Sequence, residues 1–137
     1  MKPKSTPKTT EKSNRDPLKE ITEKIISSAT EVYSQLGPGL LESVYDEALA
    51  HEFTLRRIGF ERQKEIRLTY KGKDIGWYRV DHLVEGEVLV ELKTVETLQG
   101  IHETQLLTYL RALNKKVGLL INFNVGRLKD GIKKLVL

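Results

Sequence analysis

Residues 75–93, IGWYRVDHLVEGEVLVELK, contain the pattern that decides the fold. Apolar side chains dominate 88–92, and the short sequence Glu-Gly-Glu at 85–87 separates this run from the apolar residues before it. Runs of this length, rich in branched side chains and divided by a glycine-containing turn, are typical of two strands of a β-hairpin. The sequence therefore predicts strands over 75–84 and 88–93.

Two helices and a further strand are predicted before this hairpin. Apolar residues recur at three- and four-residue steps from Leu18 to Leu36 and predict a helix that begins at Pro17 and ends at the Gly-Pro-Gly sequence of 37–39. A second helix is predicted over 41–58, with these residues on its buried side: Val44, Ala48, Leu49, Leu55 and Ile58. Apolar residues then alternate with polar ones over 66–70, which predicts a half-exposed strand.

The sequence after the hairpin predicts a helix followed by a buried strand. A helix is expected over 102–113, with Asn114 at its C-terminal cap. Residues 117–123 are almost continuously apolar, as in strands covered on both faces and paired in parallel. Residues 128–137 fit either a short edge strand or a helical turn. This order of elements predicts an α/β fold in which helices flank a mixed sheet.

Length and composition indicate one domain with a basic N-terminal tail. The chain has 137 residues, which fits a single domain at 17–137. Residues 1–17 carry five basic and two acidic side chains and no branched aliphatic or aromatic residue. We therefore expect a disordered basic tail at 1–16, serving either as a solubilising leader or as an arm that touches phosphates.

Other features of the composition exclude several classes of protein. The absence of cysteine excludes disulfide frameworks, thiolate metal sites and thiol nucleophiles. The sequence contains no apolar run long enough to cross a membrane and no apolar signal segment. We expect a cytoplasmic protein that does not contact a membrane.

The candidate chemistry lies on the predicted hairpin, at Asp81, Glu91 and Lys93. Side chains two apart in a strand share a face, so Glu91 and Lys93 point the same way. In an antiparallel hairpin, directly paired residues also share a face. A two-residue loop would place Asp81 opposite Val90, whereas a three-residue loop at 85–87 places it opposite Glu91. Because the loop contains a glycine, we predict the three-residue form.

With this register, two carboxylates meet at one point and could hold a divalent cation. Mg²⁺ prefers oxygen ligands and retains several waters, so Asp81, Glu91 and the carbonyl of Leu92 would form a suitable ligand set. Mn²⁺ is a plausible substitute. Lys93 would then orient or deprotonate a water, or stabilise the charge that develops on a phosphoryl group. The residues alone equally allow a structural ion-pair cluster without metal.

Two helical segments supply further candidates. Gln105 and Tyr109 are four residues apart and share a helix face, from which they could contact a phosphate or a base; a Tyr at the margin of the core is the alternative. Glu42, in the first turn of the second helix, either favours the helix dipole or supplies a third carboxylate directly or through water. Tyr45 shares the face of Glu42 and is a candidate for substrate binding.

These elements together resemble the GxxExxY protein family, which is grouped with the PD-(D/E)XK nuclease superfamily. The resemblance extends from about residue 18 to the C-terminus and rests on five segments: 39–45 (GLLESVY), Asp81, 90–93 (VELK), 105–109 and 118–123 (GLLINF). It implies a restriction-endonuclease-like αβββαβ core. It also maps Asp81, Glu91 and Lys93 onto a catalytic triplet, Glu42 onto an accessory acid, and Gln105 and Tyr109 onto contacts with DNA near the scissile phosphate.

The sequence thus leads to two hypotheses. The first is a Mg²⁺-dependent nuclease that hydrolyses phosphodiester bonds of nucleic acid, with DNA as the expected substrate. The second is a non-catalytic module on the same fold that binds nucleic acid or protein. Because the chain is small and leaves little sequence for target recognition, either hypothesis includes a homodimer or a protein partner.

Overall fold

The computed structural model describes residues 17–137, and the predicted tail at 1–16 lies outside them. The helices are α2 (Pro17–Leu36), α3 (Glu42–Leu55) and α4 (Gly100–Leu113), with a short 3-10 helix, η1, at Leu128–Gly131. The strands are β1 (Phe60–Tyr70), β2 (Lys73–Val84), β3 (Val88–Lys93), β4 (Val117–Asn122) and β5 (Ile132–Val136). The element order confirms the predicted α/β class.

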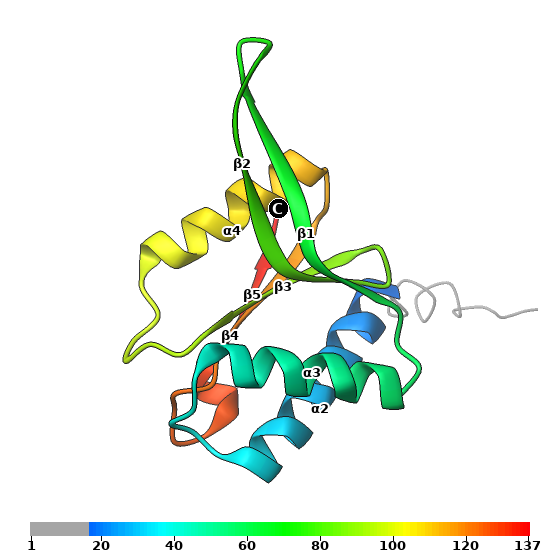
Figure 1. The fold of residues 1–137 in the computed structure, drawn as a ribbon, viewed down its shortest axis with the longest axis vertical. Helices are drawn as coiled ribbons and strands as arrows, with labels where there is room; N and C mark the ends of the chain where they lie inside the picture. The colour runs from blue at the N-terminus through cyan, green and yellow to red at the C-terminus, as the bar shows by residue number, and fades with distance from the viewer. Residues whose placement is uncertain (1–16) are drawn as a thin grey trace, which may run out of the picture.

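All five strands form one mixed sheet, which separates two hydrophobic cores. The strands lie in chain order, with β3 and β4 parallel and the other neighbours antiparallel. Helices α2 and α3 cover one face and α4 covers the other (Figure 1). Val88, Val90 and Leu92 pack toward α2 and α3, whereas Leu89 packs toward α4. The sheet is therefore covered on both faces around β3, as expected for a parallel pair.

The turn between β2 and β3 has the predicted length. Val84 pairs with Val88, and His82 pairs with Val90, so the three residues 85–87 form the loop. Glu85 and Gly86 both have positive φ, 53° and 69°, which only glycine adopts without strain. This register is confirmed, and it places position 81 opposite position 91.

Helix α3 differs from the prediction in its length and in the side that it buries. It ends at Leu55 rather than at residue 58, because Arg57 adopts a left-handed conformation and the N–H of Ile58 returns to the carbonyl of Phe53. Tyr45, Leu49, Ala50 and Phe53 are buried, whereas Leu55 is 63% exposed. The predicted buried side is wrong for Val44 and Leu55, because the aromatic residues face the core instead.

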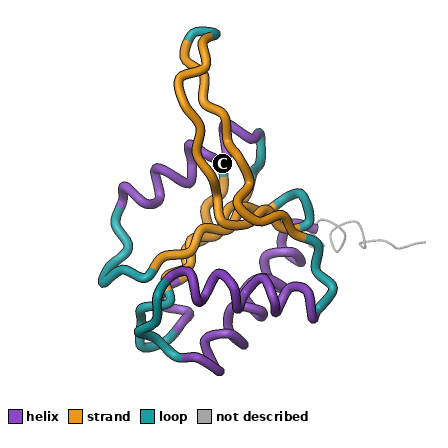
Figure 2. The backbone as a smooth tube through the Cα atoms, viewed as in Figure 1, coloured by secondary structure: helices purple, strands orange, loops and turns teal. Residues whose placement is uncertain are grey.

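The β1–β2 hairpin is longer than predicted and extends beyond the body of the sheet (Figure 2). Strand β1 begins at Phe60 rather than at residue 66, and the two strands pair as far as Tyr70 and Lys73. Pairing between β2 and β3 covers only the last residues of β2, from His82 to Val84. Most of the hairpin therefore has β-partners on one side only.

The C-terminal elements confirm most of their predictions. Asn114 caps α4 in the left-handed conformation, with φ of 56° and ψ of 46°. Strand β4 pairs with β3 in parallel, and residues 128–137 contain both a 3-10 turn and an edge strand. Among residues 17–137, no helix combines the length and apolar character needed to cross a membrane.

Candidate functional site

The carboxylates of Asp81 and Glu91 meet where β2 and β3 separate. The backbone N–H of Asp81 donates to Oε1 of Glu91 (3.1 Å), and the N–H of Leu92 donates to Oδ2 of Asp81 (2.8 Å). Each side chain thus accepts a hydrogen bond from the backbone of the other strand. The structure brings these two predicted residues together.

These hydrogen bonds follow from the divergence of the strands. Backbone pairing between β2 and β3 ends at His82 and Val90, so the next N–H groups need acceptors other than the opposite backbone. The carboxylates of Asp81 and Glu91 provide them. Because each backbone contact uses one oxygen, each carboxylate retains a second oxygen for another partner.

The site favours the protonated forms of its acids. Burial, together with the nearby Asp81 carboxylate, raises the pKa of Glu91 to about 8 from its ordinary value of 4.5. Burial likewise raises the pKa of Asp81. Two half-buried carboxylates that lie side by side repel each other when both are charged, and a bound proton or cation relieves that repulsion.

Lys93 lies at the end of β3, two residues beyond Glu91, and is half-buried. Its charge opposes the rise in the pKa of Glu91 and also acts on Glu42. Lys93 forms no ion pair within the part of the chain that the structure describes. Its ammonium group is therefore available to a ligand near the carboxylate pair.

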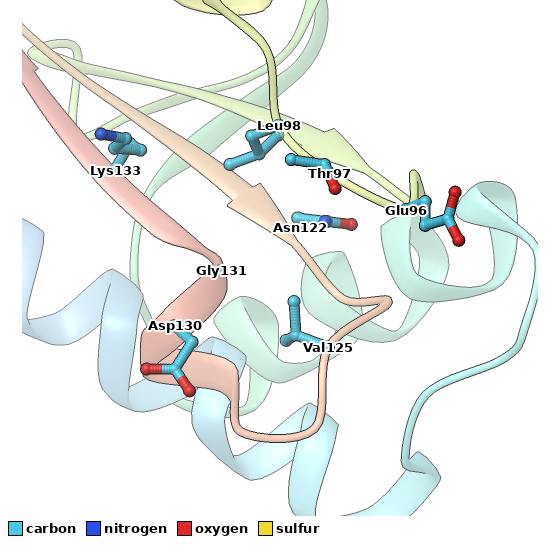
Figure 3. Close-up of a pocket in the computed structure, with 8 residues that line it drawn as sticks. All are labelled: Glu96, Thr97, Leu98, Asn122, Val125, Asp130, Gly131 and Lys133. Carbon is cyan, nitrogen blue, oxygen red and sulfur yellow. The ribbon is translucent and has the colours of Figure 1, made fainter.

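Asn122 holds the loop that follows Lys93. Its Nδ2 donates to the carbonyl of Val95 (2.8 Å), and its Oδ1 accepts from the N–H of the same residue (3.1 Å). Figure 3 shows Asn122 beside this loop, in a hollow of about 240 Å³. Gly131 lets its backbone approach that of Asn122 closely, since a Cβ there would lie 2.2 Å from the carbonyl oxygen of Asn122. These contacts fix the end of β3, and with it the base of the Lys93 side chain.

Glu42 lies across a second hollow from Asp81. This hollow has a volume of about 320 Å³ and is lined by Glu42, Ser43, Asp46, Gln63 and Asp81. Burial and the charge of Asp81 raise the pKa of Glu42. Among residues 17–137, however, no three acidic or histidine side chains are close enough to hold a metal ion. These residues therefore do not place three carboxylates at one point, and a contact of Glu42 with the site through water stays a prediction.

Sequence reasoning missed a polar cluster behind Asp81. His82 is fully buried, and its Nε2 lies 2.6 Å from Oδ1 of Asp46. Arg62 donates to Asp46 (2.8 Å) and to Glu47 (3.0 Å). Burial lowers the pKa of His82, so its neutral form is favoured. Hydrophobic periodicity gives no signal for this cluster, because its members come from α3, β1 and β2.

The predicted substrate-binding residues differ in their environments. Gln105 is exposed on α4. Tyr109 is buried beside Leu106 and Leu110, in the core cluster on this face of the sheet. Burial, followed by the charge of Glu91, raises the pKa of Tyr109 to about 12, so its hydroxyl remains a hydrogen-bond donor.

Tyr45 does not have the environment expected of a substrate contact. Its side chain is fully buried and stacks on Phe123, with the ring centroids 4.4 Å apart. Its hydroxyl donates to the carbonyl of Gly37 (2.6 Å) and accepts from the N–H of Leu40 (3.2 Å). These contacts fix the turn between α2 and α3, which corrects the prediction for Tyr45.

Comparisons with known proteins agree with this architecture. A family model described as the PD-(D/E)XK nuclease superfamily matches residues 19–135. The crystal structure of SSO0001 is similar in fold, with a TM-score of 0.52 and 18% sequence identity. That similarity covers 69% of this chain and 48% of SSO0001, so the chain spans about half of its length. No curated protein matches the sequence.

Proposed function

Because this chain belongs to the PD-(D/E)XK nuclease superfamily, we propose that it hydrolyses phosphodiester bonds of nucleic acid with the help of a divalent cation. The observation that supports this proposal is the paired arrangement of Asp81 and Glu91 at the separation of β2 and β3. Mg²⁺ is the cation that we propose, with Mn²⁺ as a substitute, and DNA is the proposed substrate.

The donor set at this point fits a hard cation. Asp81 and Glu91 each retain an oxygen that the backbone does not use, and the carbonyl of Leu92 belongs to the residue directly after Glu91. Oxygen ligands of this kind suit Mg²⁺, which completes its shell with water. A bound divalent cation lowers the pKa of a water and polarises a phosphoryl oxygen.

The remaining residues have roles that follow from their positions. We assign to Lys93 the orientation of the attacking water or the stabilisation of the developing negative charge. We assign to Glu42 a contact through water, across the hollow that it shares with Asp81. Gln105 is exposed and free to contact the substrate, and Tyr109 offers a protonated hydroxyl beside Glu91.

A structural ion-pair cluster explains the site less well. Such a cluster needs Lys93 to pair with Glu91 or Asp81, and no such ion pair occurs in the described residues. Two acids with raised pKa values and no bound counter-charge are a costly way to stabilise a fold. The arrangement instead resembles a binding site in which burial perturbs the acids that bind the ligand.

The decisive experiment incubates the purified chain and Mg²⁺ or Mn²⁺ with single- and double-stranded oligonucleotides. Cleavage should require the cation and should fall on the order of 10³-fold in Asp81→Asn and Glu91→Gln, which remove the negative charge needed to hold it. Glu87→Gln is the matched control, since this acid is exposed in the turn. Binding without cleavage, undiminished by a chelator, would instead identify the non-catalytic module.

Finer assignments belong to the same proposal. Gly39, Glu42 and Tyr45 provide the pattern that gives the GxxExxY family its name, and we propose membership of that branch. A cytoplasmic location and a homodimer or protein partner complete the proposal.

A further inference from the structure

The outer part of the β1–β2 hairpin, residues 64–79, is here called the arm. Its tip projects beyond the rest of the sheet (Figures 1 and 2), whereas Ile66 and Leu68 near its base pack in the core beside α4. The arm carries five basic and two acidic side chains. It also exposes four large apolar side chains to between 48% and 61%: Tyr70, Ile75, Trp77 and Tyr78.

The aromatic and basic groups of the arm lie next to one another. The guanidinium of Arg79 lies over the ring of Trp77, 4.9 Å from its centroid, and Arg67 is directly opposite Trp77 in the register. At the tip, Nζ of Lys71 lies 5.4 Å from the centroid of the Tyr70 ring. Arg79, Lys71 and Lys73 form no ion pair within the described residues, so their charges are not neutralised there.

The base of the arm leads to the carboxylate pair. Arg79 precedes Asp81 by two residues on β2, and the ring of Tyr78 lies 5.9 Å from that of Tyr109. From Lys73 to Asp81 the strand is about 26 Å long, at roughly 3.3 Å per residue. A nucleic-acid strand that follows the arm would therefore reach the site after about eight nucleotides or fewer, at a rise of roughly 3.4 Å each.

We propose that the arm binds an unpaired segment of nucleic acid and directs it toward Asp81 and Glu91. Aromatic rings offer stacking surfaces that unpaired bases can use, and neighbouring cations contact the phosphates. A duplex hides the faces of its bases, so it would contact the basic side chains of the arm but could not stack on the aromatic rings. The arm has a net charge of +3, so the arms of two copies would repel each other, which makes a second copy of the chain a poorer fit to this surface.

This inference rests on the proposed function for its direction, but its test does not need catalysis. Binding is measured in a chelator by anisotropy of labelled oligonucleotides of about 20 nucleotides, single-stranded or duplex. Trp77 is the single tryptophan of the chain, so its intrinsic fluorescence reports on the arm alone. We expect the single strand to bind more tightly than the duplex and to quench this fluorescence.

Two arm variants separate stacking from charge. Trp77→Leu keeps an apolar side chain and should weaken single-strand binding on the order of tenfold. The double variant Lys71→Gln with Lys73→Gln should make the slope of log K against log salt concentration shallower by about 1.4. Each lost phosphate contact on a single strand contributes roughly 0.7 to that slope. Lys19→Gln with Lys24→Gln on α2 is the control of equal charge, on the far side of the molecule, and should change neither quantity.

The outcomes distinguish this inference from the proposed function. Normal binding by both arm variants, or equal binding of duplex with unchanged Trp77 fluorescence, would overturn the role of the arm and leave cleavage to be judged separately. A change of oligomeric state in Trp77→Leu, with unchanged affinity, would assign the arm to self-association instead. Arm-dependent binding without any cleavage in Mg²⁺ or Mn²⁺ would support the arm and contradict the nuclease.

Discussion

The two ends of strand β2 have opposite environments. Residues 82–84 are buried and pair with both β1 and β3. Residues 73–79 pair with β1 alone and are exposed. One continuous strand thus belongs at one end to the core and at the other to a projecting hairpin.

Asp81 lies at the boundary between these two environments, and this position explains its chemistry. On the core side, backbone groups hydrogen-bond to each other across β2 and β3. On the other side, β3 no longer pairs with the backbone of β2, so the carboxylate of Asp81 can accept a hydrogen bond from the N–H of Leu92. The same boundary buries Asp81 enough to raise its pKa while leaving a hollow of about 320 Å³ beside it. The fold therefore creates the site by ending the β2–β3 pairing early.

The largest expected effect tests the contrast directly. Leu83 is 4% exposed and Ile75 is 57% exposed, and both lie on β2. Leu83→Ala should lower the free energy of unfolding by about 4 kcal/mol, because it leaves a cavity among packed side chains. Ile75→Ala removes as many carbons but should change it by less than about 0.5 kcal/mol. Chemical denaturation measures both values, and equal losses would show that the arm packs against the body.

The next effect concerns the acid at the boundary. Because the pKa of Glu91 is raised to about 8, the folded chain holds a proton that the unfolded chain releases near 4.5. In the presence of a chelator, the free energy of unfolding should therefore fall as pH rises from about 5 to 8, by roughly 3 kcal/mol. Glu91→Gln cannot titrate and should remove the contribution of this group, leaving those of Asp81, Glu42 and His82, whose pKa values are also shifted. A wild-type profile that falls no more steeply than that of Glu91→Gln would contradict the raised pKa.

Cation binding should offset that loss. At a concentration 100 times its Kd, a ligand that binds the folded state alone adds about 2.7 kcal/mol to the free energy of unfolding. Thermal unfolding with added Mg²⁺ or Mn²⁺ should show this gain in the wild type and in Glu87→Gln. Asp81→Asn should abolish it. An equal gain in Asp81→Asn would mean that the cation binds elsewhere on the chain.

The sequence contained enough information for the register at this boundary. The alternation of 88–93 determines which side chains share a face, and the length of the turn determines which residues pair. Both are local properties of a few residues. For the same reason, the parallel pairing of β4 followed from its continuous apolar run, and the cap of α4 followed from Asn114.

The parts that could not be predicted depend on contacts between distant segments. Helix α3 has apolar residues on two sides, and Tyr45 faces the core because it stacks on Phe123, far along the chain. Tyr109 is buried for a similar reason, since it shares a core cluster with Ile66 and Val80 of the first hairpin and its ring contacts Tyr78. The contact between His82 and Asp46 joins a strand to a helix and leaves no trace in either periodicity. Composition also gives no measure of how far a hairpin projects from a domain.

The smallest expected effect concerns the one aromatic contact between the arm and α4. The rings of Tyr78 and Tyr109 lie 5.9 Å apart and are tilted by 36°. A double-mutant cycle with Tyr78→Ala and Tyr109→Leu should give a coupling of about 1 kcal/mol in the free energy of unfolding. The same cycle with Trp77→Leu in place of Tyr78→Ala should give none, because the indole contacts Arg79 rather than α4. Coupling at Tyr78 alone would show that this ring contact helps to anchor the base of the arm, where Ile66 and Leu68 also pack, and that Trp77 is independent of α4. A coupling of zero at both positions would mean that the base is held by Ile66, Leu68 and backbone pairing, without a contribution from the rings.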